Sequence, residues 1–156
     1  MARWVRRLWV MGGSFGPDAE PEHNFRSDEA AQTVLNAGIP TTVTGLEITQ
    51  RVSIDSGRLE RIRAAGALGA ALGGDIEQWW AHWNKTWNVR HDPVAVLTLT
   101  RPDLFTFSAP GRIDITLGTG LSAFVADPAG TVRIATDLDT EAVAEEITTR
   151  IVAAGG

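Results

Sequence analysis

The order of strand, loop, helix and strand in the first third of the chain constrains the fold more than any other feature. Residues 8–11, LWVM, form a short apolar run closed by two glycines, and residues 41–48, TTVTGLEI, are rich in β-branched side chains. The segment between them has Ser27 as a candidate N-cap and Gly38 as a helix stop. A helix that connects two strands in this way is typical of a parallel crossover unit, so the sequence predicts an α/β fold.

The rest of the chain fits a partly parallel sheet flanked by helices, with a C-terminal block of strands and a final helix. We expect one domain over residues 1–156. The first helix is expected to bury Ala30, Ala31, Val34 and Leu35. The other expected elements are two or more helices over 56–87, broken near 66–74, a helix over 93–100, strands over 112–118, 121–127 and 131–137, and a last helix capped by Asp139 and ended by Gly155.

Composition narrows the classes of function. The net charge of −5 argues against a surface for nucleic acid or anionic membranes, since each needs a basic patch. The chain has no cysteine, which excludes a disulfide framework and a thiol nucleophile. No apolar run approaches the roughly 18 residues of a membrane-spanning helix, and the run at 8–11 is too short for a secretory signal. We expect a soluble, cytoplasmic protein.

His91, Asp92 and Pro93 stand directly before an apolar run and allow two interpretations. Asp is a favoured N-cap and Pro is favoured at the first helical position, so these residues could simply begin a helix. A carboxylate can also ligate a hard cation, and a neighbouring histidine can donate a proton near neutral pH. The local pattern alone favours capping and leaves the catalytic interpretation open.

Glu22 and Asn24 form a second candidate site, in the loop that follows residues 8–11. In an extended loop, side chains two residues apart point the same way, and these two offer acceptor and donor groups suited to sugar hydroxyls. The alternative is a solvated loop in which Asn24 or Ser27 caps the next helix. The location favours a site, because ligands of open α/β sheets bind beyond the carboxyl ends of the strands.

Four tryptophans gather in the segment WWAHWNKTW. Trp79, Trp83 and Trp87 recur every four residues, and Trp80 lies beside the first of them. Aromatic side chains at this spacing can stack on a flat ligand. A stripe of this kind is more often part of a core or of an interface, and both interpretations remain open here.

Three segments in a fixed order connect these candidates: LWVMGG, then EHNF with DEAA and LEIT, then HDPVAV followed by strands. Together they resemble the inosine-uridine preferring nucleoside hydrolase family. In that family the middle segment reads roughly E-F-N, three residues, D-P-E-A-A, with a later strand of leucine, aspartate, valine and threonine. The resemblance extends from about Leu8 to Ile151.

The resemblance implies an enzyme that hydrolyses the N-glycosidic bond of ribonucleosides with the help of a bound calcium ion. His91 matches the acid that protonates the leaving base, and Asp92 matches a calcium ligand. The resemblance therefore raises the catalytic interpretation of this pair above plain capping.

The resemblance also assigns the substrate-binding residues. Glu22 and Asn24 match residues that hold the ribose hydroxyls, and Met11 matches the methionine that lines the sugar site. Trp79 and Trp83 occupy the region that supplies aromatic contacts to the base. The implied ligand is a ribonucleoside or a related small molecule.

The chain departs from the family in ways that affect this assignment. Its sequence has no counterpart of the family's early aspartate cluster, D-T-D-x-G-x-D-D, and one carboxylate does not hold calcium, which takes about six to eight oxygens. The strand at 8–11 would also lack a neighbour on one side. We therefore expect a homo-oligomer, or a hetero-oligomer with a chain that carries the absent half. The alternatives are a binding or interaction subunit without hydrolysis, and a biosynthetic protein recruited on the same scaffold.

Overall fold

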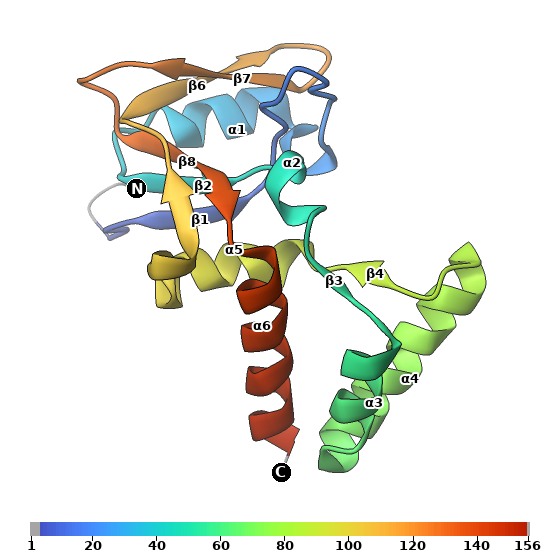
Figure 1. The fold of residues 1–156 in the computed structure, drawn as a ribbon. Coiled ribbons are helices and arrows are strands. Elements are labelled where there is room, and N and C mark those ends of the chain that lie inside the picture. The colour runs from blue at the N-terminus through green and yellow to red at the C-terminus, as the bar shows by residue number, and fades with distance from the viewer. Residues whose placement is uncertain (1–3, 156) are drawn as a thin grey trace.

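The computed structural model describes residues 4–155 and contains one main sheet with helices on both faces (Figure 1). The sheet has the order β1-β2-β8-β6-β7, and β5 also pairs with β8. A two-stranded ladder of β3 and β4 lies outside this sheet. The strands are β1 (Leu8–Met11), β2 (Thr41–Thr44), β3 (Ser53–Ile54), β4 (Asn88–Val89), β5 (Phe105–Phe107), β6 (Gly111–Thr116), β7 (Leu121–Ala126) and β8 (Val132–Leu138).

Helices cover both faces of the sheet and form one apolar core on each face, and a third, smaller core lies between α3 and α4. One core lies between α1 and the sheet and includes Phe25, Leu35 and Val43. The other lies under α2, α5 and α6 and includes Leu97 and Val143. The helices are η1 (His23–Phe25), α1 (Asp28–Leu35), α2 (Leu46–Thr49), α3 (Ser56–Arg63), α4 (Gly66–Trp83), α5 (His91–Thr100), η2 (Pro102–Leu104) and α6 (Thr140–Gly155). Among the helices described, none is both long and apolar enough to cross a membrane.

The predicted crossover unit and α/β fold are confirmed. β1 and β2 pair in parallel from Leu8 opposite Thr41 to Met11 opposite Thr44, and α1 connects them. β8 pairs in parallel with the other side of β2. β1 lies at the end of the strand order and has β2 as its one strand neighbour within residues 4–155, as the sequence led us to expect.

The buried face of α1 differs from the predicted one. Leu35 is buried and Ala31 packs against the same core, but Val34 is 45% exposed and Ala30 faces solvent. The helix is turned so that Ala31 and Leu35, one turn apart, face the sheet. Four apolar positions within six residues left the orientation of this short helix undecided, and packing against β6 selects it.

The predicted strand over residues 41–48 is too long. The strand ends at Thr44, Gly45 takes the N-cap position, and α2 begins at Leu46. Ile48 and Thr49 are then buried by a helical turn and not by a strand. The β-branched composition of this segment is equally compatible with one tightly packed helical turn after a glycine. The alternation of its residues does not distinguish this turn from a longer strand.

The helical region over 56–87 breaks only once, before Gly66, and α4 then continues through the glycines where we had expected an interruption. Gly69 and Gly73 are buried where α3 crosses α4 closely. A Cβ on Gly69 would lie 2.0 Å from the carbonyl oxygen of Ile62, and one on Gly73 would lie 2.1 Å from Cγ of Arg63. These glycines permit the close approach of two helices and do not end one.

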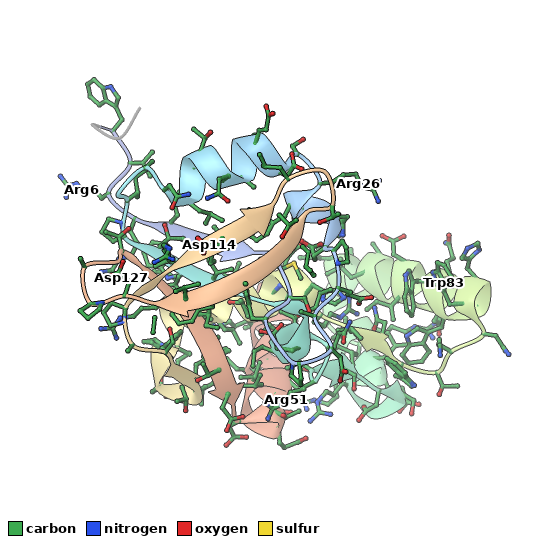
Figure 2. The ribbon with its side chains drawn as sticks, turned by 90° about the horizontal axis from the view of Figure 1, so that it is seen from above. Arg6, Arg26, Arg51, Trp83, Asp114 and Asp127 are labelled. Carbon is green, nitrogen blue, oxygen red and sulfur yellow. The ribbon has the colours of Figure 1, made fainter. Side chains whose placement is uncertain are left out.

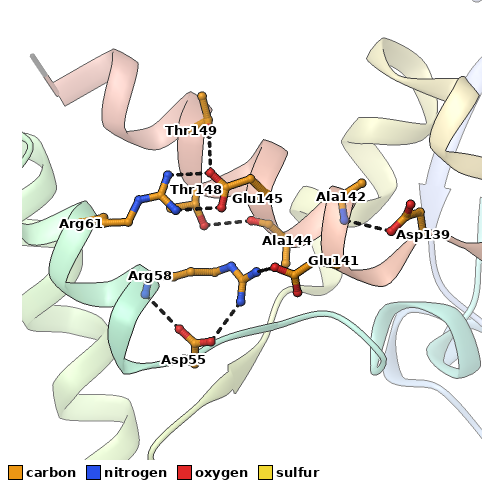
Figure 3. Close-up of polar contacts among 10 residues, drawn as sticks. All are labelled: Asp55, Arg58, Arg61, Asp139, Glu141, Ala142, Ala144, Glu145, Thr148 and Thr149. Atoms are coloured by element: carbon orange, nitrogen blue, oxygen red, sulfur yellow. Dashed lines mark hydrogen bonds and ion pairs between the residues drawn. The ribbon is translucent and has the colours of Figure 1, made fainter.

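Ion pairs connect the pair of helices α3 and α4 to the body of the molecule through α6 (Figure 3). Arg61 on α3 binds both carboxylate oxygens of Glu145 on α6, at 2.7 and 2.6 Å. Arg58 pairs with Asp55 and also with Glu141 at the start of α6. Asp139 accepts a hydrogen bond from the Ala142 amide at 3.0 Å, which confirms its predicted role as the cap of the last helix.

Candidate functional site

The candidate site lies at the carboxyl ends of β1 and β2, where the loop after Met11 folds back over the sheet. Glu22 is only 3% exposed, and its Oε2 accepts hydrogen bonds from the amides of Gly13, at 3.2 Å, and Asn24, at 3.0 Å. Its Oε1 lies 2.6 Å from Nδ1 of the exposed His23, an ion pair when that ring is protonated. One carboxylate oxygen therefore organises the loop, and the other has unused acceptor capacity.

Asn24 joins this loop to the end of β1. Its Nδ2 donates to the carbonyl oxygen of Met11 at 3.1 Å and lies 3.4 Å from the Met11 sulfur. The structure thus brings Met11, Glu22 and Asn24 together, as expected for residues at the carboxyl end of one strand. Glu22 is buried and hydrogen-bonded, whereas Asn24 is exposed, so the solvated-loop interpretation fails for Glu22 alone.

His91 begins α5 and reaches α2. Its Nδ1 lies 2.7 Å from Oγ1 of Thr49, a residue that is itself fully buried. The pKa of His91 lies below its ordinary value because burial disfavours the charged ring. Asp92 and then Glu22 oppose this effect through their negative charge, while His23 adds to it. The pKa of His91 thus responds also to the charges of Glu22 and His23 on the loop after β1.

Asp92 does not cap α5, so the capping interpretation is wrong. The N-cap position belongs to Arg90, and Asp92 lies inside the first helical turn without a side-chain cap hydrogen bond. There its charge interacts favourably with the helix dipole. The exposed Asp92 also borders a groove of about 360 Å³ between α5 and α6, which Val96, Ile147 and Arg150 line as well.

The two predicted base contacts lie elsewhere. Trp79 and Trp83 are 40% and 58% exposed on α4, whose main packing partners are α3, α6 and β4. Trp83 lies at the outer end of α4, at the periphery of the molecule (Figure 2). The main contacts of α4 thus lie with other elements than β1 and η1, which carry Met11 and Asn24.

The residues present do not make a calcium site by themselves. Within residues 4–155, no group of three or more histidine and carboxylate side chains is placed to hold a metal ion. Asp92 supplies one carboxylate, whereas calcium takes about six to eight oxygen ligands. The buried Glu22 is already bonded to two backbone amides.

Sequence reasoning missed two residues of this region. Glu47 on α2 turns its carboxylate toward the loop after β1, where its Oε2 accepts from the amide of Phe15 at 3.1 Å. Thr49 holds the ring of His91. Both belong to the LEIT segment on which the resemblance partly rests, so their position in that motif was the signal that could have identified them.

The parallel pair β1–β2 with its crossover helix makes this an α/β protein, and Asn24 and the buried Glu22 follow the carboxyl end of β1, where ligands of open α/β sheets bind. Residues 1–145 match the sequence profile of the inosine-uridine preferring nucleoside hydrolases. The chain therefore belongs to this family.

Individual relatives agree with the family assignment. The pyrimidine-specific ribonucleoside hydrolase RihA of Enterobacter sp. (strain 638) is 34% identical over 115 residues, which are 67% of this chain and 36% of that protein. A purine-preferring ribonucleoside hydrolase from Gardnerella vaginalis has a similar structure, with a TM-score of 0.77 and 22% identity over 94% of this chain and 50% of the other. A plant nucleoside hydrolase also has a similar structure, with a TM-score of 0.73 and 22% identity over 92% of this chain and 51% of the other. The chain thus spans about a third of the curated relatives' length and half of the solved ones'.

Proposed function

We propose that this chain carries the ribose and leaving-base side of a nucleoside N-ribohydrolase site. The observation that carries the proposal is the buried Glu22 carboxylate, held beside Asn24 and Met11 at the end of β1. Family membership supports ribonucleosides as the ligand class.

The acceptor capacity of Glu22 supports the ribose assignment. Within residues 4–155 its Oε1 has Nδ1 of the exposed His23 as its one polar neighbour, at 2.6 Å, so a lone pair is left to accept from a ribose hydroxyl, while Asn24 lies next to it on the same turn. Met11 would line the apolar side of the sugar. Trp79 and Trp83 are assigned to the base by the family resemblance alone, since the main contacts of α4 lie with other elements.

His91 is the proposed general acid. When the C1′–N bond breaks, the bonding electron pair leaves with the base, and Nε2 of a protonated His91 gives its proton to the base nitrogen. Water adds to C1′ and loses a proton, which completes the hydrolysis. Thr49 fixes Nδ1, so Nε2 is the nitrogen that remains available.

Completion of the site would come from a second polypeptide. Asp92 is the proposed metal ligand in this chain, and the further carboxylates would belong to another copy or to a chain that carries the family's aspartate cluster. The open edge of β1 offers unpaired backbone groups to which such a chain could add a strand.

The test is a titration of uridine and inosine into the purified chain, followed by an assay for free base with and without calcium. We expect nucleoside binding that Glu22→Gln and Asn24→Ala each weaken by about tenfold, and little hydrolysis until the completing polypeptide is added. Wild-type binding that both variants leave unchanged, or no binding at all, would overturn the assignment of the ribose site. Exposed Glu20→Gln is the matched control for the charge change.

A binding subunit without hydrolysis is the second candidate. It is favoured by the lack of a three-ligand metal group within residues 4–155. Nucleoside binding with no turnover in any mixture would select it. A recruited biosynthetic role is the third candidate, and a ligand that depends on His91 but not on Glu22 or Asn24 would point to it.

A further inference from the structure

A cavity of about 600 Å³ lies at the amino ends of β1, β2 and β8, whereas the proposed nucleoside site lies beyond the carboxyl ends of β1 and β2. Its walls come from these strands, from the end of α5 and from the segments on either side of β5. None of Met11, Glu22, Asn24 and His91 lines it. The cavity is large enough for a small molecule, and the proposed function leaves it without a role.

Three side chains from neighbouring strands form one row in this cavity. Trp9 lies opposite Thr42, and Thr42 lies opposite Arg133. Partners at the same level of parallel strands point to the same face of the sheet. Ala135, two residues after Arg133, belongs to the core under α5, and α5 also packs on β1 and β2, so the row points to that face (Figure 1). The sheet thus presents an indole, a hydroxyl and a guanidinium to the cavity together.

The charged groups in the cavity wall are Arg7 and Arg133, and within residues 4–155 no carboxylate lines it. Most arginines of the described chain form ion pairs with carboxylates, but these two form none within residues 4–155. The whole chain has a net charge of −5, so a wall with two unpaired positive charges stands out from it. Guanidinium groups without a counterion in the protein favour an anionic ligand.

Trp9 holds the Arg7 guanidinium in place. The guanidinium carbon lies 5.6 Å from the centroid of the indole ring, within the range of a cation–π interaction. A guanidinium over a ring keeps the N–H donors at its edge available, and these match pairs of phosphate oxygens. Thr42 and Thr131 add hydroxyl donors to the same wall. The polar part of the wall therefore fits a phosphate group.

The remaining wall of the cavity is apolar. Pro40, Leu99, Pro102, Phe107 and Pro110 line it. Such side chains pack against a planar ring and offer no partner to a charged group. A ligand that fits both parts of the wall carries a phosphate at one end and a flat ring at the other.

We propose that this cavity binds a phosphate monoester with a flat ring, of the type of a mononucleotide. Arg7 and Arg133 bind the phosphate, and Leu99 and Phe107 contact the ring. The cavity lies at another end of the sheet than the nucleoside site, so the proposal does not depend on the proposed function.

The first experiment is calorimetric titration of uridine and inosine 5′-monophosphates into the full chain. We expect at least one nucleotide to bind, and Arg7→Gln and Arg133→Gln each to weaken it by about tenfold or more, because each removes a charge-assisted hydrogen bond. Arg6→Gln is the matched control. Arg6 is the exposed neighbour of Arg7, but it does not line the cavity and points outward at the edge of the molecule (Figure 2).

The second experiment separates the ring from the phosphate. We expect inorganic phosphate to bind about tenfold or more weakly than the nucleotide, because it lacks the apolar contacts. Leu99→Ser should weaken the nucleotide several-fold and leave inorganic phosphate unchanged. Val96→Ser is its control, since Val96 is 57% exposed on the same helix but lines the groove between α5 and α6. Circular dichroism of each variant confirms that the fold is retained.

Glu22→Gln distinguishes this cavity from the proposed nucleoside site, because it should leave the affinity for the nucleotide unchanged. No binding of either nucleotide overturns the proposal, as does binding that both arginine variants leave intact. Nucleotide binding that Glu22→Gln weakens as much as Arg133→Gln does also overturns it, because the nucleotide then occupies the nucleoside site. Equal affinities for inorganic phosphate and the nucleotide would remove the ring from the proposal and overturn it as well.

Discussion

Oγ1 of Thr49 lies 2.7 Å from Nδ1 of His91 and ties the end of α2 to the first residue of α5, across 42 positions of sequence. The hydroxyl also points to the carbonyl oxygen of Leu46, at 3.4 Å. With its proton directed there, Oγ1 accepts a hydrogen bond from Nδ1–H of the ring. This arrangement favours the tautomer that carries its proton on Nδ1.

Thr49→Val tests this assignment without any substrate. In the wild-type chain we expect neutral His91 to carry its proton on Nδ1, and in the variant to shift toward the commoner Nε2–H form, because the acceptor is lost. Nitrogen chemical shifts report the tautomer directly, and the chain has only three histidines to resolve. Thr148→Val, a buried threonine on α6, is the control. An unchanged tautomer would remove Thr49 as a positioning residue.

The charge on His91 has a defined pH dependence. Burial lowers its pKa, so its NMR titration should have a midpoint below the value of about 6.5 found for an unperturbed histidine. The folded chain then binds fewer protons than the unfolded one in this window, and stability falls as the pH drops from about 6.5 through the folded pKa. His91→Gln should remove this slope from a series of thermal melts. A slope that persists in the variant would assign it to another group.

Glu22 should matter for stability as well as for binding. Its carboxylate satisfies two backbone amides of the loop after β1, and Glu22→Gln replaces a charged acceptor by a neutral one. We expect a loss of about 1–3 kcal/mol in the free energy of unfolding, measured by urea denaturation. The exposed control Glu20→Gln should change it by no more than about 0.5 kcal/mol. Equal effects of the two substitutions would contradict the buried role of Glu22.

The ion pair between Arg61 and Glu145 predicts an acid-sensitive step in the attachment of α3 to α6. The hydrogen bond from Arg61 lowers the pKa of Glu145 from 4.5 to about 2. The stabilisation that the pair contributes is therefore fully present above about pH 4.5 and is lost as the pH falls toward 2. The difference in melting temperature between wild type and Glu145→Gln should shrink over this range. Exposed Glu60→Gln should show no such convergence.

The sequence predicted the parts of the fold that depend on local order. The apolar run at 8–11, the stop at Gly38 and the cap at Asp139 each act on neighbouring residues, and the structure contains the elements they indicate. The gathering of Met11, Glu22 and Asn24 followed from their place after one strand.

Relations between distant segments were not visible in the same way. Thr49 and His91 are joined only by tertiary packing, and nothing in either local pattern indicates the other. The start of α5 at His91 also displaced Asp92 from the cap into the helix, a shift of two residues that propensity does not resolve. The exposure of Trp83 depends on where α3 and α6 stop covering α4, which is a property of the assembled fold.

The glycines of α4 give a last prediction with its own internal control. Alanine favours a helix over glycine by roughly 1 kcal/mol, so Gly74→Ala, which meets nothing within 4 Å, should stabilise the chain by about that amount. Gly69→Ala gains the same propensity but places Cβ 2.0 Å from the carbonyl oxygen of Ile62, a contact with backbone that no side-chain rotation relieves. The helices must then separate, and overpacking of this kind costs about 1–3 kcal/mol or more. We therefore expect the two glycine-to-alanine substitutions, five residues apart, to change the free energy of unfolding in opposite directions. Urea denaturation of the two variants measures these changes. If both stabilise the chain, α3 and α4 are not in the close contact that the structure shows.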